Sequence, residues 1–443
     1  MTASARDLAL ATPPGRDRYV DLLRVASLGT VIGGHWLMAA VSSDGIGNLL
    51  ALVPALQVLT WGLQVMPVFF FVGGFSHALS YRSLARRSET SVYAAFLRAR
   101  LQRLLRPTLV FVLVWAAAAL AVQLAGHGDG RLTGAALRLV TQPLWFIGIY
   151  LAMVAFTPPL LKLHERHGWA AFAALAGASA LVDVLRFTFG VPYVEFLNFA
   201  LVWLAVHQLG FLRADGRIRR PAALAAAGLA GAVLLVAYGP YPLSMVGMPG
   251  EKVSNMAPPT LALLAHGMWL VGAVQLLARP ATHWLARPRV WRGVVAANGV
   301  AMTAFLWHLT AMLGVYGAQL ALGLDLPAPA GSAWWAQVPV RILAATALTA
   351  VFVTLFRRFE APAAPRTGTA GGAGGGPVAA LGITLCLLGI LGLSMTGLGG
   401  LLDGHSATLI AFPVTAPVAI GMALAGALLV ERSAPARSVR LGS

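Results

Sequence analysis

Charged residues are scarce in this sequence. Only 11% of its 443 residues are Asp, Glu, Lys or Arg, whereas 58% are hydrophobic. A water-soluble protein of this length has no interior large enough for so much apolar side chain, so the composition excludes a soluble globular fold. It predicts an integral membrane protein that has the lipid bilayer as its main partner.

Acidic residues and cysteine are rarer still. The chain has 15 Asp and Glu against 32 Lys and Arg, and its single cysteine, Cys386, excludes an intramolecular disulfide framework. The net charge of +17 is not arranged as a basic stripe with interleaved aromatic residues, so we expect no nucleic-acid partner. The arginines gather instead in short segments between apolar runs, as the positive-inside rule describes.

Motifs of several enzyme classes are also missing. The sequence contains no Gly-x-Ser-x-Gly nucleophile elbow. The histidines of "HERH" (164–167) lack the HExxH spacing and stand in a basic segment that we expect to be a loop, so no metal site is predicted. "GGAGGG" (371–376) follows no predicted strand, which argues against dinucleotide binding.

Apolar segments recur along the chain at lengths that suit a bilayer. A membrane-spanning helix needs about 20 largely apolar residues. By this criterion the sequence predicts about twelve spans, which lie near 20–41, 55–79, 107–126, 144–161, 169–186, 195–212, 221–238, 260–278, 298–322, 339–356, 377–398 and 407–430. The predicted fold is therefore an all-α polytopic membrane protein.

Loop charges predict the orientation of these spans. If the spans are as above, the arginine-dense segments all fall on one side of the membrane, and we expect that side and both termini to be cytoplasmic. The segments are the N-terminus, 81–107, 162–167, 213–220, 279–292, 357–366 and 431–440. The first apolar stretch is too long for a cleavable signal peptide, so we expect it to be retained. Arginine outnumbers lysine, and alanine and glycine abound, which suggests a GC-rich bacterial source and the cytoplasmic membrane as location.

A Gly/Pro/Ala-rich stretch divides the chain. Its composition is that of a flexible linker. The sequence therefore predicts a core of about ten spans at 1–358, a linker at 359–376, a two-helix membrane appendage at 377–430 and a basic cytoplasmic tail at 431–443.

The first predicted span carries two ionisable side chains that are costly in a bilayer. Arg24 and His35 are eleven residues apart, which on a helix is three turns plus about 20°, so both project from one face with ~16 Å between them along the axis. Asp21, one turn earlier, is placed to pair with Arg24. One interpretation is that Arg24 reaches the lipid head groups and His35 bonds a neighbouring helix. The other is that His35 is a general base beside a cavity that the nearby glycines Gly29, Gly33 and Gly34 leave open.

Five stretches of the sequence together resemble the acyltransferase-3 family of membrane proteins. "RYVDLLRVASLGTVIGGHWL" (18–37) carries the Arg/Lys-X10-His pattern of that family's first helix. "VMPVFFFVGGFSHALSYRS" (65–83) resembles its second helix, with Gly73 where the family usually has serine. "FLRARLQRLLRP" (96–107) resembles its Arg-x-x-Arg-x-x-Pro loop. "PLWFIGIYL" (143–151) and "MTAFLWHLT" (302–310) resemble two later motifs.

The resemblance implies transfer of an acyl group, commonly acetyl, from a cytoplasmic acyl-CoA donor to a hydroxyl of a glycan, a lipid-linked sugar or a small metabolite. It implies that His35 is the catalytic centre and that Arg24, paired with Asp21, supports it. It also assigns Arg100 and Arg103 to the donor. Guanidinium groups suit phosphates because they are planar, permanently charged and bidentate.

Acyl transfer also requires donors for the developing oxyanion and contacts to the substrate. The candidate hydrogen-bond donors to the oxyanion are Trp145, Tyr150 or a backbone N–H. His308 is interpreted either as a substrate contact or as a structural histidine. His77, after "VGGFS", is expected to be solvated at the cytoplasmic end of its span.

Two other classes of function remain open from the sequence. A secondary transporter or exporter would use Asp21, Arg24 and His35 as a substrate or proton path, although the related halves with discontinuous helices that such proteins show are not found in the sequence. A scaffold with a degenerate site, whose C-terminal helices recruit a partner enzyme, is compatible with the substitution at Gly73. Acetyl-CoA turnover would separate an enzyme from both alternatives.

Overall fold

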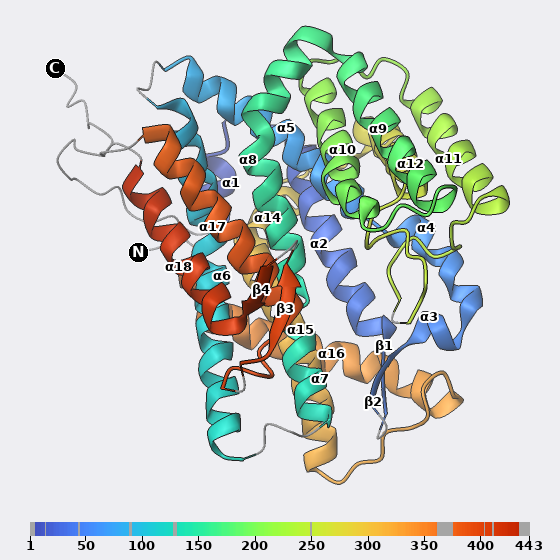
Figure 1. Ribbon diagram of the computed structural model, residues 1–443, viewed down its shortest axis with the longest axis vertical. Coiled ribbons are helices and arrows are strands. Elements are labelled where there is room, and N and C mark those ends of the chain that lie inside the picture. Colours follow the sequence, from blue (N-terminus) through green and yellow to red (C-terminus); the bar gives the residue numbers. More distant parts are fainter. Residues whose placement is uncertain are drawn as a thin grey trace. The chain divides into compact units, whose positions relative to one another are not determined.

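The computed structural model describes residues 5–13, 15–42, 45–87, 91–126, 131–248, 250–360, 375–402, 404–409 and 412–433 (Figure 1). Most of the predicted linker and nearly all of the predicted basic tail lie outside these residues.

Helices make up most of the described chain and confirm the all-α polytopic class. Ten helical segments among the described residues are long and apolar enough to cross a membrane. The number rises to 11 if helices α12 (Leu261–Leu276) and α13 (Ala278–Leu285), which meet at a 50° bend, form one broken span. The helix of the first predicted span, α2 (Arg18–Met38), is continuous but is not among the ten. Asp21, Arg24 and His35 lower its mean hydropathy.

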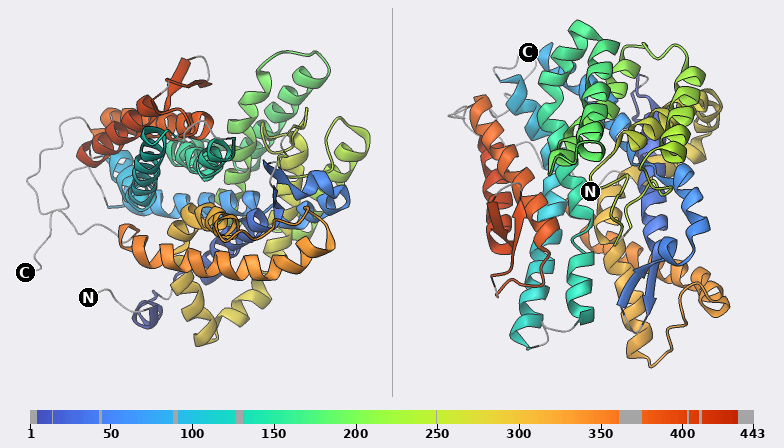
Figure 2. Two further views of the ribbon diagram at one scale, coloured as in Figure 1. Left: turned by 90° about the horizontal axis from the view of Figure 1, so that it is seen from below. Right: turned by 45° about the vertical axis from the view of Figure 1, so that its right-hand side comes forward.

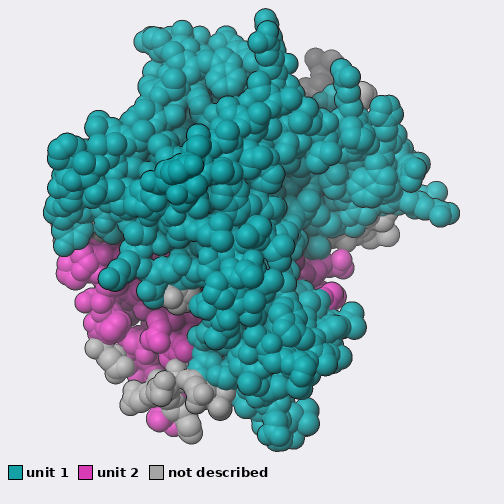
Figure 3. All heavy atoms as spheres, turned by 90° about the vertical axis from the view of Figure 1, so that its right-hand side faces the viewer, with its two compact units in different colours: residues 1–78, 159–301, 315–345 teal, residues 79–158, 302–314, 346–443 magenta. Residues whose placement is uncertain are grey.

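The chain folds into two compact units, which are coloured separately in Figure 3. Unit 1 comprises residues 1–78, 159–301 and 315–345, and unit 2 comprises residues 79–158, 302–314 and 346–443. Four helices contribute residues to both units, namely α5 (Met66–Ala85), α8 (Pro143–His167), α15 (Ala301–Ala321) and α16 (Ser332–Phe356).

Unit 1 contains α2 and a group of helices packed through small residues. Its other elements are α1 (Ala5–Leu10), the hairpin β1–β2 (Ala39–Ser42 and Gly45–Asn48), α3 (Leu49–Leu52), η1 (Pro54–Leu59), α4 (Thr60–Leu63), α9 (Trp169–Phe187), η2 (Val194–Leu197), α10 (Asn198–Ala214), α11 (Pro221–Tyr238), α12, α13 and α14 (Pro288–Asn298). A Cβ atom at Gly228 of α11 would overlap the backbone of α12, and one at Gly74 of α5 would overlap the backbone of α10. Such close approach of backbones is how membrane helices gain packing energy without a hydrophobic driving force.

Unit 2 contains α6 (Val92–Leu124), α7 (Arg131–Leu139), η3 (Arg357–Phe359), α17 (Gly375–Thr396), the hairpin β3–β4 (Ser406–Leu409 and Phe412–Thr415) and α18 (Ala416–Ser433). Helices α17 and α18 lie side by side (Figure 2). Gly382, Gly389 and Gly426 allow this, because a Cβ atom on any of them would overlap the facing helix. α18 also packs against α6.

Three predicted segments differ from the structure. The last predicted span, 407–430, begins too early, because residues 406–409 and 412–415 form the paired strands β3 and β4, in which Thr and Val favour extended backbone. The segment 96–107, interpreted as a loop, is part of α6, since its leucines recur at helical spacing and Leu97, Leu101, Leu104 and Leu105 are buried. "HERH" (164–167) is likewise the last turn of α8 rather than a loop.

Candidate active site

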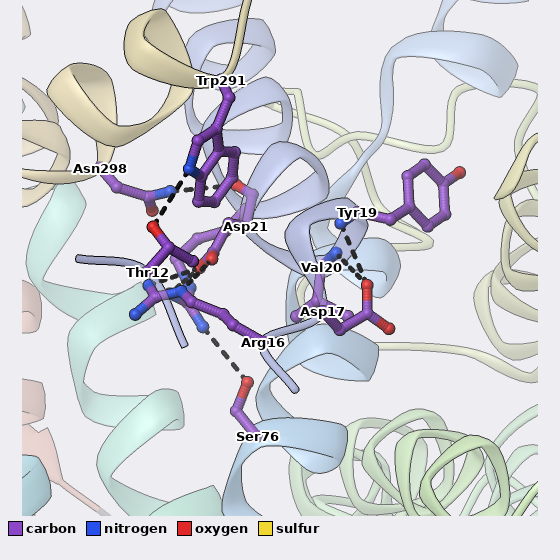
Figure 4. Close-up of polar contacts among 10 residues, drawn as sticks. Thr12, Arg16, Asp17, Tyr19, Val20, Asp21, Ser76, Trp291 and Asn298 are labelled. Carbon is purple, nitrogen blue, oxygen red and sulfur yellow. Dashed lines mark hydrogen bonds and ion pairs between the residues drawn. The ribbon is translucent and has the colours of Figure 1, made fainter. Parts of the chain in front are cut away.

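Asp17 fixes the start of α2. Its side chain accepts hydrogen bonds from the backbone N–H groups of Tyr19 (3.0 Å) and Val20 (3.2 Å), which is the usual role of an N-cap aspartate (Figure 4). The other carboxylate oxygen of Asp17 lies 2.7 Å from Arg213 of α10. Arg213 also donates to Gln275 of α12, and the hydroxyl of Tyr19 donates to the carbonyl of Val274. The first turn of α2 is therefore held by α10 and α12.

Asp21 is the centre of an ionic cluster one turn further along α2. The residue is only 4% exposed. Its carboxylate accepts from Nε and Nη2 of Arg16, at 2.6 and 3.1 Å, and from Nη1 of Arg24 at 3.4 Å. The predicted pair of Asp21 and Arg24 is thus present, but Arg16 is the closer partner. Arg16 lies before the helix and sequence spacing alone did not identify it.

Arg24 also reaches the second helix of the sequence pattern. Its Nη2 donates to Oγ of Ser76 on α5 at 3.2 Å. Asn298, the last residue of α14, donates from its side-chain amide to the backbone carbonyl of Asp21 at 3.3 Å. Residues 16, 21, 24, 76 and 298 therefore form one polar cluster, shown in part in Figure 4. Its charge is set by two arginines and one buried carboxylate.

Close to this cluster, α14 is tied to the N-terminal segment. The indole N–H of Trp291 donates to Oγ1 of Thr12 at 3.1 Å, as Figure 4 shows. The guanidinium of Arg18 lies over the Trp291 ring, 4.9 Å from its centroid. These contacts fix the segment from which Arg16 projects.

His35 lies in the second half of α2, which is packed differently from the first. All buried residues of α2 lie in its first half, between residues 19 and 28. By contrast, every residue from 30 to 39 is only partly buried. A Cβ atom built at Gly29 or Gly33 would meet no atom within 4 Å. Because α2 is continuous from Arg18 to Met38, Arg24 and His35 project from the same face, ~16 Å apart along the axis.

The end of α2 beyond His35 is held by a buried arginine. Tyr316 of α15 donates to the carbonyl of Ala39, the C-cap residue of α2, at 3.4 Å. Arg341 of α16, 8% exposed, donates to the Tyr316 hydroxyl at 3.0 Å and to Gln337 at 2.8 Å. Its guanidinium also lies 5.5 Å from the centre of the Trp334 ring. Sequence reasoning missed Arg341 because its partner Tyr316 lies on a different helix, 25 residues earlier in the chain.

The predicted donor-binding arginines lie on α6 in unit 2. Arg103 is exposed and Arg100 is partly buried. Arg103 lies about 140° around α6 from Arg98, so the arginines of this segment do not form one patch. The charge of Arg103 acts on Glu360, which follows η3. Burial raises the pKa of Glu360, while hydrogen bonds from Thr303 and Met302 and the charge of Arg103 oppose that rise.

Trp145, Tyr150 and His308, the residues predicted to bind the substrate or its developing oxyanion, belong to one aromatic group in unit 2. The Phe146 ring contacts Trp145, Tyr150 and Phe305, with centroid distances of 6.3, 6.4 and 5.1 Å. His308 stacks on Phe305 at 5.6 Å, is fully buried, and donates from Nδ1 to the carbonyl of Phe305. This hydrogen bond to the backbone satisfies one of the two ring nitrogens, as is usual for a histidine with a structural role.

Buried histidines elsewhere correct one prediction. His77, expected to be solvated, is fully buried on α5, and its Nδ1 lies 3.0 Å from Nε2 of His207 on α10. The reason is the close crossing of these helices at Gly74 and Gly210, which places both rings between them. His164 is also fully buried, with Nε2 2.9 Å from Asp215 and Nδ1 bonded by Gln208.

Comparison with known protein families identifies the class of this chain. Residues 17–358 match the Acyl_transf_3 family model, described as an acyltransferase domain. The match covers well over half of the sequence, so the chain belongs to the acyltransferase-3 family and is a membrane acyltransferase. Helices α17 and α18 lie outside the matched residues. No curated protein and no solved structure matches the chain.

Proposed function

We propose that this protein transfers an acetyl group from cytoplasmic acetyl-CoA to a hydroxyl of a glycan, a lipid-linked sugar or a small metabolite, with His35 as general base. The observation that carries the proposal is the contrast within α2. Near the start of α2, Arg24 is fixed by hydrogen bonds to Asp21 and Ser76. His35 lies three turns further along the helix, in a stretch (residues 30–39) whose residues are all only partly buried.

The chemistry follows from these positions. A neutral imidazole can accept the proton of the acceptor hydroxyl as its oxygen attacks the thioester carbonyl. The carbon–sulfur bond then breaks, the acetyl group remains on the acceptor oxygen, and the proton held by His35 is available to the departing CoA thiolate. Trp145 and Tyr150 are the proposed hydrogen-bond donors to the developing oxyanion, and His308 is a proposed substrate contact.

The acyl-CoA donor must place its phosphates and its thioester at two different depths in the membrane. Its phosphates remain near the cytoplasmic surface, and we assign them to Arg100 and Arg103 on α6. A pantetheine arm is long and thin enough to carry the thioester from the depth of Arg24 toward that of His35, ~16 Å away. This arrangement supposes a bacterial cytoplasmic membrane with both termini in the cytoplasm.

Thiol release from acetyl-CoA tests the proposal. The purified chain would be reconstituted in proteoliposomes with crude envelope extract as the source of acceptor. His35→Ala should lower turnover by about 100-fold or more, the usual contribution of a positioned base. The exposed His283 provides the matched control His283→Ala, which should leave turnover unchanged.

A second pair of variants tests the donor site. Replacing Arg100 and Arg103 by alanine should raise the KM for acetyl-CoA about tenfold or more, because each removes a charge-assisted bond to phosphate. Turnover that survives in the His35→Ala variant, or a KM that the arginine variants leave unchanged, would overturn the corresponding assignment. Uptake of a labelled solute without thiol release would support a transporter instead.

A further inference from the structure

A groove of about 470 Å³ lies along α6 and α18 in unit 2. It belongs to neither the cluster around Asp21 nor the predicted donor-binding residues. One of its walls is the helix of the acyltransferase core that carries Arg98 and Arg106, and the other is a helix outside the matched acyltransferase residues. The groove therefore lies where α18, one of the two C-terminal helices, meets the core within this unit.

The groove is polar at one end and aliphatic over the rest of its length. Its polar lining residues are Arg98, Gln102, Arg106 and Glu431. The floor contains Leu101 and Leu105, which are 2% and 4% exposed. Beyond Arg106 the lining is apolar, from Leu109 to Leu113 on α6 and at Leu424 and Ala427 on α18. α18 runs antiparallel to α6, so Glu431 lies at the polar end (Figures 1 and 2).

The dimensions match one leaflet of a bilayer. Arg98 and Leu113, at the two ends of the groove, are fifteen residues apart on one continuous helix, which is ~22 Å along its axis. A bilayer is about 40–45 Å thick including its head groups, so the whole groove, with its polar end, is about as long as one leaflet is deep. Leu113, at its far end, is 46% exposed and open to the lipid side.

The charge at the polar end favours an anion. Two guanidinium groups and one carboxylate line it, which leaves an excess of positive charge. Arg106 is exposed and has no hydrogen-bond or ion-pair partner within the part of the chain that the structure describes. The polar lining residues of α6 and α18 lie in the segments 81–107 and 431–440, which the sequence predicts to be cytoplasmic. Basic pockets between helices at that surface bind anionic lipid head groups.

We propose that this groove binds one anionic phospholipid, with the phosphate at Arg98 and Arg106 and an acyl chain along Leu101, Leu105, Leu109 and Leu113. An acyl-CoA, like a phospholipid, has both phosphate groups and an acyl chain and is therefore the competing ligand for this groove. However, the described residues that line the groove include no aromatic side chain for an adenine ring, and Gln102 is the one uncharged polar residue among them. A phospholipid needs no more than the groove provides. It would join the appendage helix α18 to α6 by filling the space between them.

Native mass spectrometry of the purified full chain in detergent tests this. The probes are phosphatidylglycerol and phosphatidylcholine with identical acyl chains. Wild type should retain phosphatidylglycerol in preference. Arg98→Gln and Arg106→Gln should each weaken phosphatidylglycerol retention about fivefold, the usual effect of one basic residue at a lipid surface. The control Arg87→Gln changes an exposed arginine of the same unit that does not line the groove and should have no effect.

Two further measurements complete the test. Ala427→Trp should fill the groove and lower retention of both lipids, while size-exclusion chromatography confirms that the variant is folded. Equal retention of the two lipids by wild type would overturn the proposal without any variant. Displacement of phosphatidylglycerol by palmitoyl-CoA at equal concentration would overturn it in favour of an acyl-CoA site. None of these readouts depends on acyl transfer.

Discussion

Asp21 lies closer to Arg16 than to Arg24, at 2.6 Å against 3.4 Å. The side chain of Arg16 is 51% exposed and that of Arg24 is 32% exposed, whereas that of Asp21 is 6% exposed. One nearly buried carboxylate therefore holds two arginines that reach it from the surface. This makes Asp21, rather than either arginine, the residue on which the cluster depends.

Asp21→Ala should destabilise the protein more than Arg16→Ala. The aspartate change leaves Arg24 without its carboxylate partner and should cost about 1–2 kcal/mol, a value reduced from that of a buried pair because both arginines are solvated. Arg16→Ala keeps the Arg24 contact and should cost less than about 1 kcal/mol. Thermal unfolding in detergent measures both. Equal losses of stability in the two variants would show that the cluster depends on Arg16 as much as on Asp21.

Ser76→Ala should reduce turnover while leaving stability nearly unchanged. The substitution removes one hydrogen bond from Arg24, which is worth about 0.5–1.5 kcal/mol and corresponds to at most about tenfold in kcat/KM. Ser83→Ala on the same helix provides the control. A melting temperature that falls with turnover would mean that the bond to Ser76 supports packing rather than the orientation of Arg24.

Gly74→Ala should be much more destabilising than Gly33→Ala. The added methyl group at Gly74 overlaps the backbone of α10, which side-chain rotation cannot relieve, so a loss of about 1–3 kcal/mol is expected. The methyl group at Gly33 meets no atom within 4 Å, and alanine is the better helix former, so this variant should be as stable as wild type or more so. Fluorescence-monitored thermal unfolding of the two proteins decides this.

Glu360 should make stability depend on pH in a direction opposite to that of most carboxylates. Burial raises its pKa in the folded protein above the ordinary 4.5. Its stabilising contribution is therefore fully present below pH 4.5 and is lost as pH rises through the folded-state pKa. Glu360→Gln removes this titration.

The difference in melting temperature between wild type and Glu360→Gln should consequently shift against wild type as pH is raised from below 4.5 through the folded-state pKa of Glu360. Each protein is compared with the other at the same pH, which cancels the titration of all other groups. A difference that stays constant across this range would show that the hydrogen bonds from Met302 and Thr303 fully offset burial.

The sequence predicted the helical membrane fold because span length and loop charge are local properties. The pairing of Asp21 with Arg24 could also be predicted from the sequence, since residues three apart on a helix are neighbours. The extension of α6 through Arg98 was missed because arginines outweigh its leucine periodicity. The burial of His77 was missed because its partner, His207, is 130 residues away. Ser76 and Asn298 join Asp21 and Arg24 only through tertiary contacts, and Arg16 lies before α2, where helical spacing does not apply.

The contacts of Asp17 and Tyr19 bear on the order in which the protein is made. Asp17 is bound by Arg213, and Tyr19 by Val274, so the start of α2 gains these partners only when residues some 200 and 250 positions later have left the ribosome. At about 5–20 residues per second, this is a delay of tens of seconds at the slower rate. During that time α2, the least apolar of the long helices, lies in the bilayer or at its surface without the Arg213 partner of Asp17. Its retention there would depend on an insertion factor, or on head groups that stand in for Arg213.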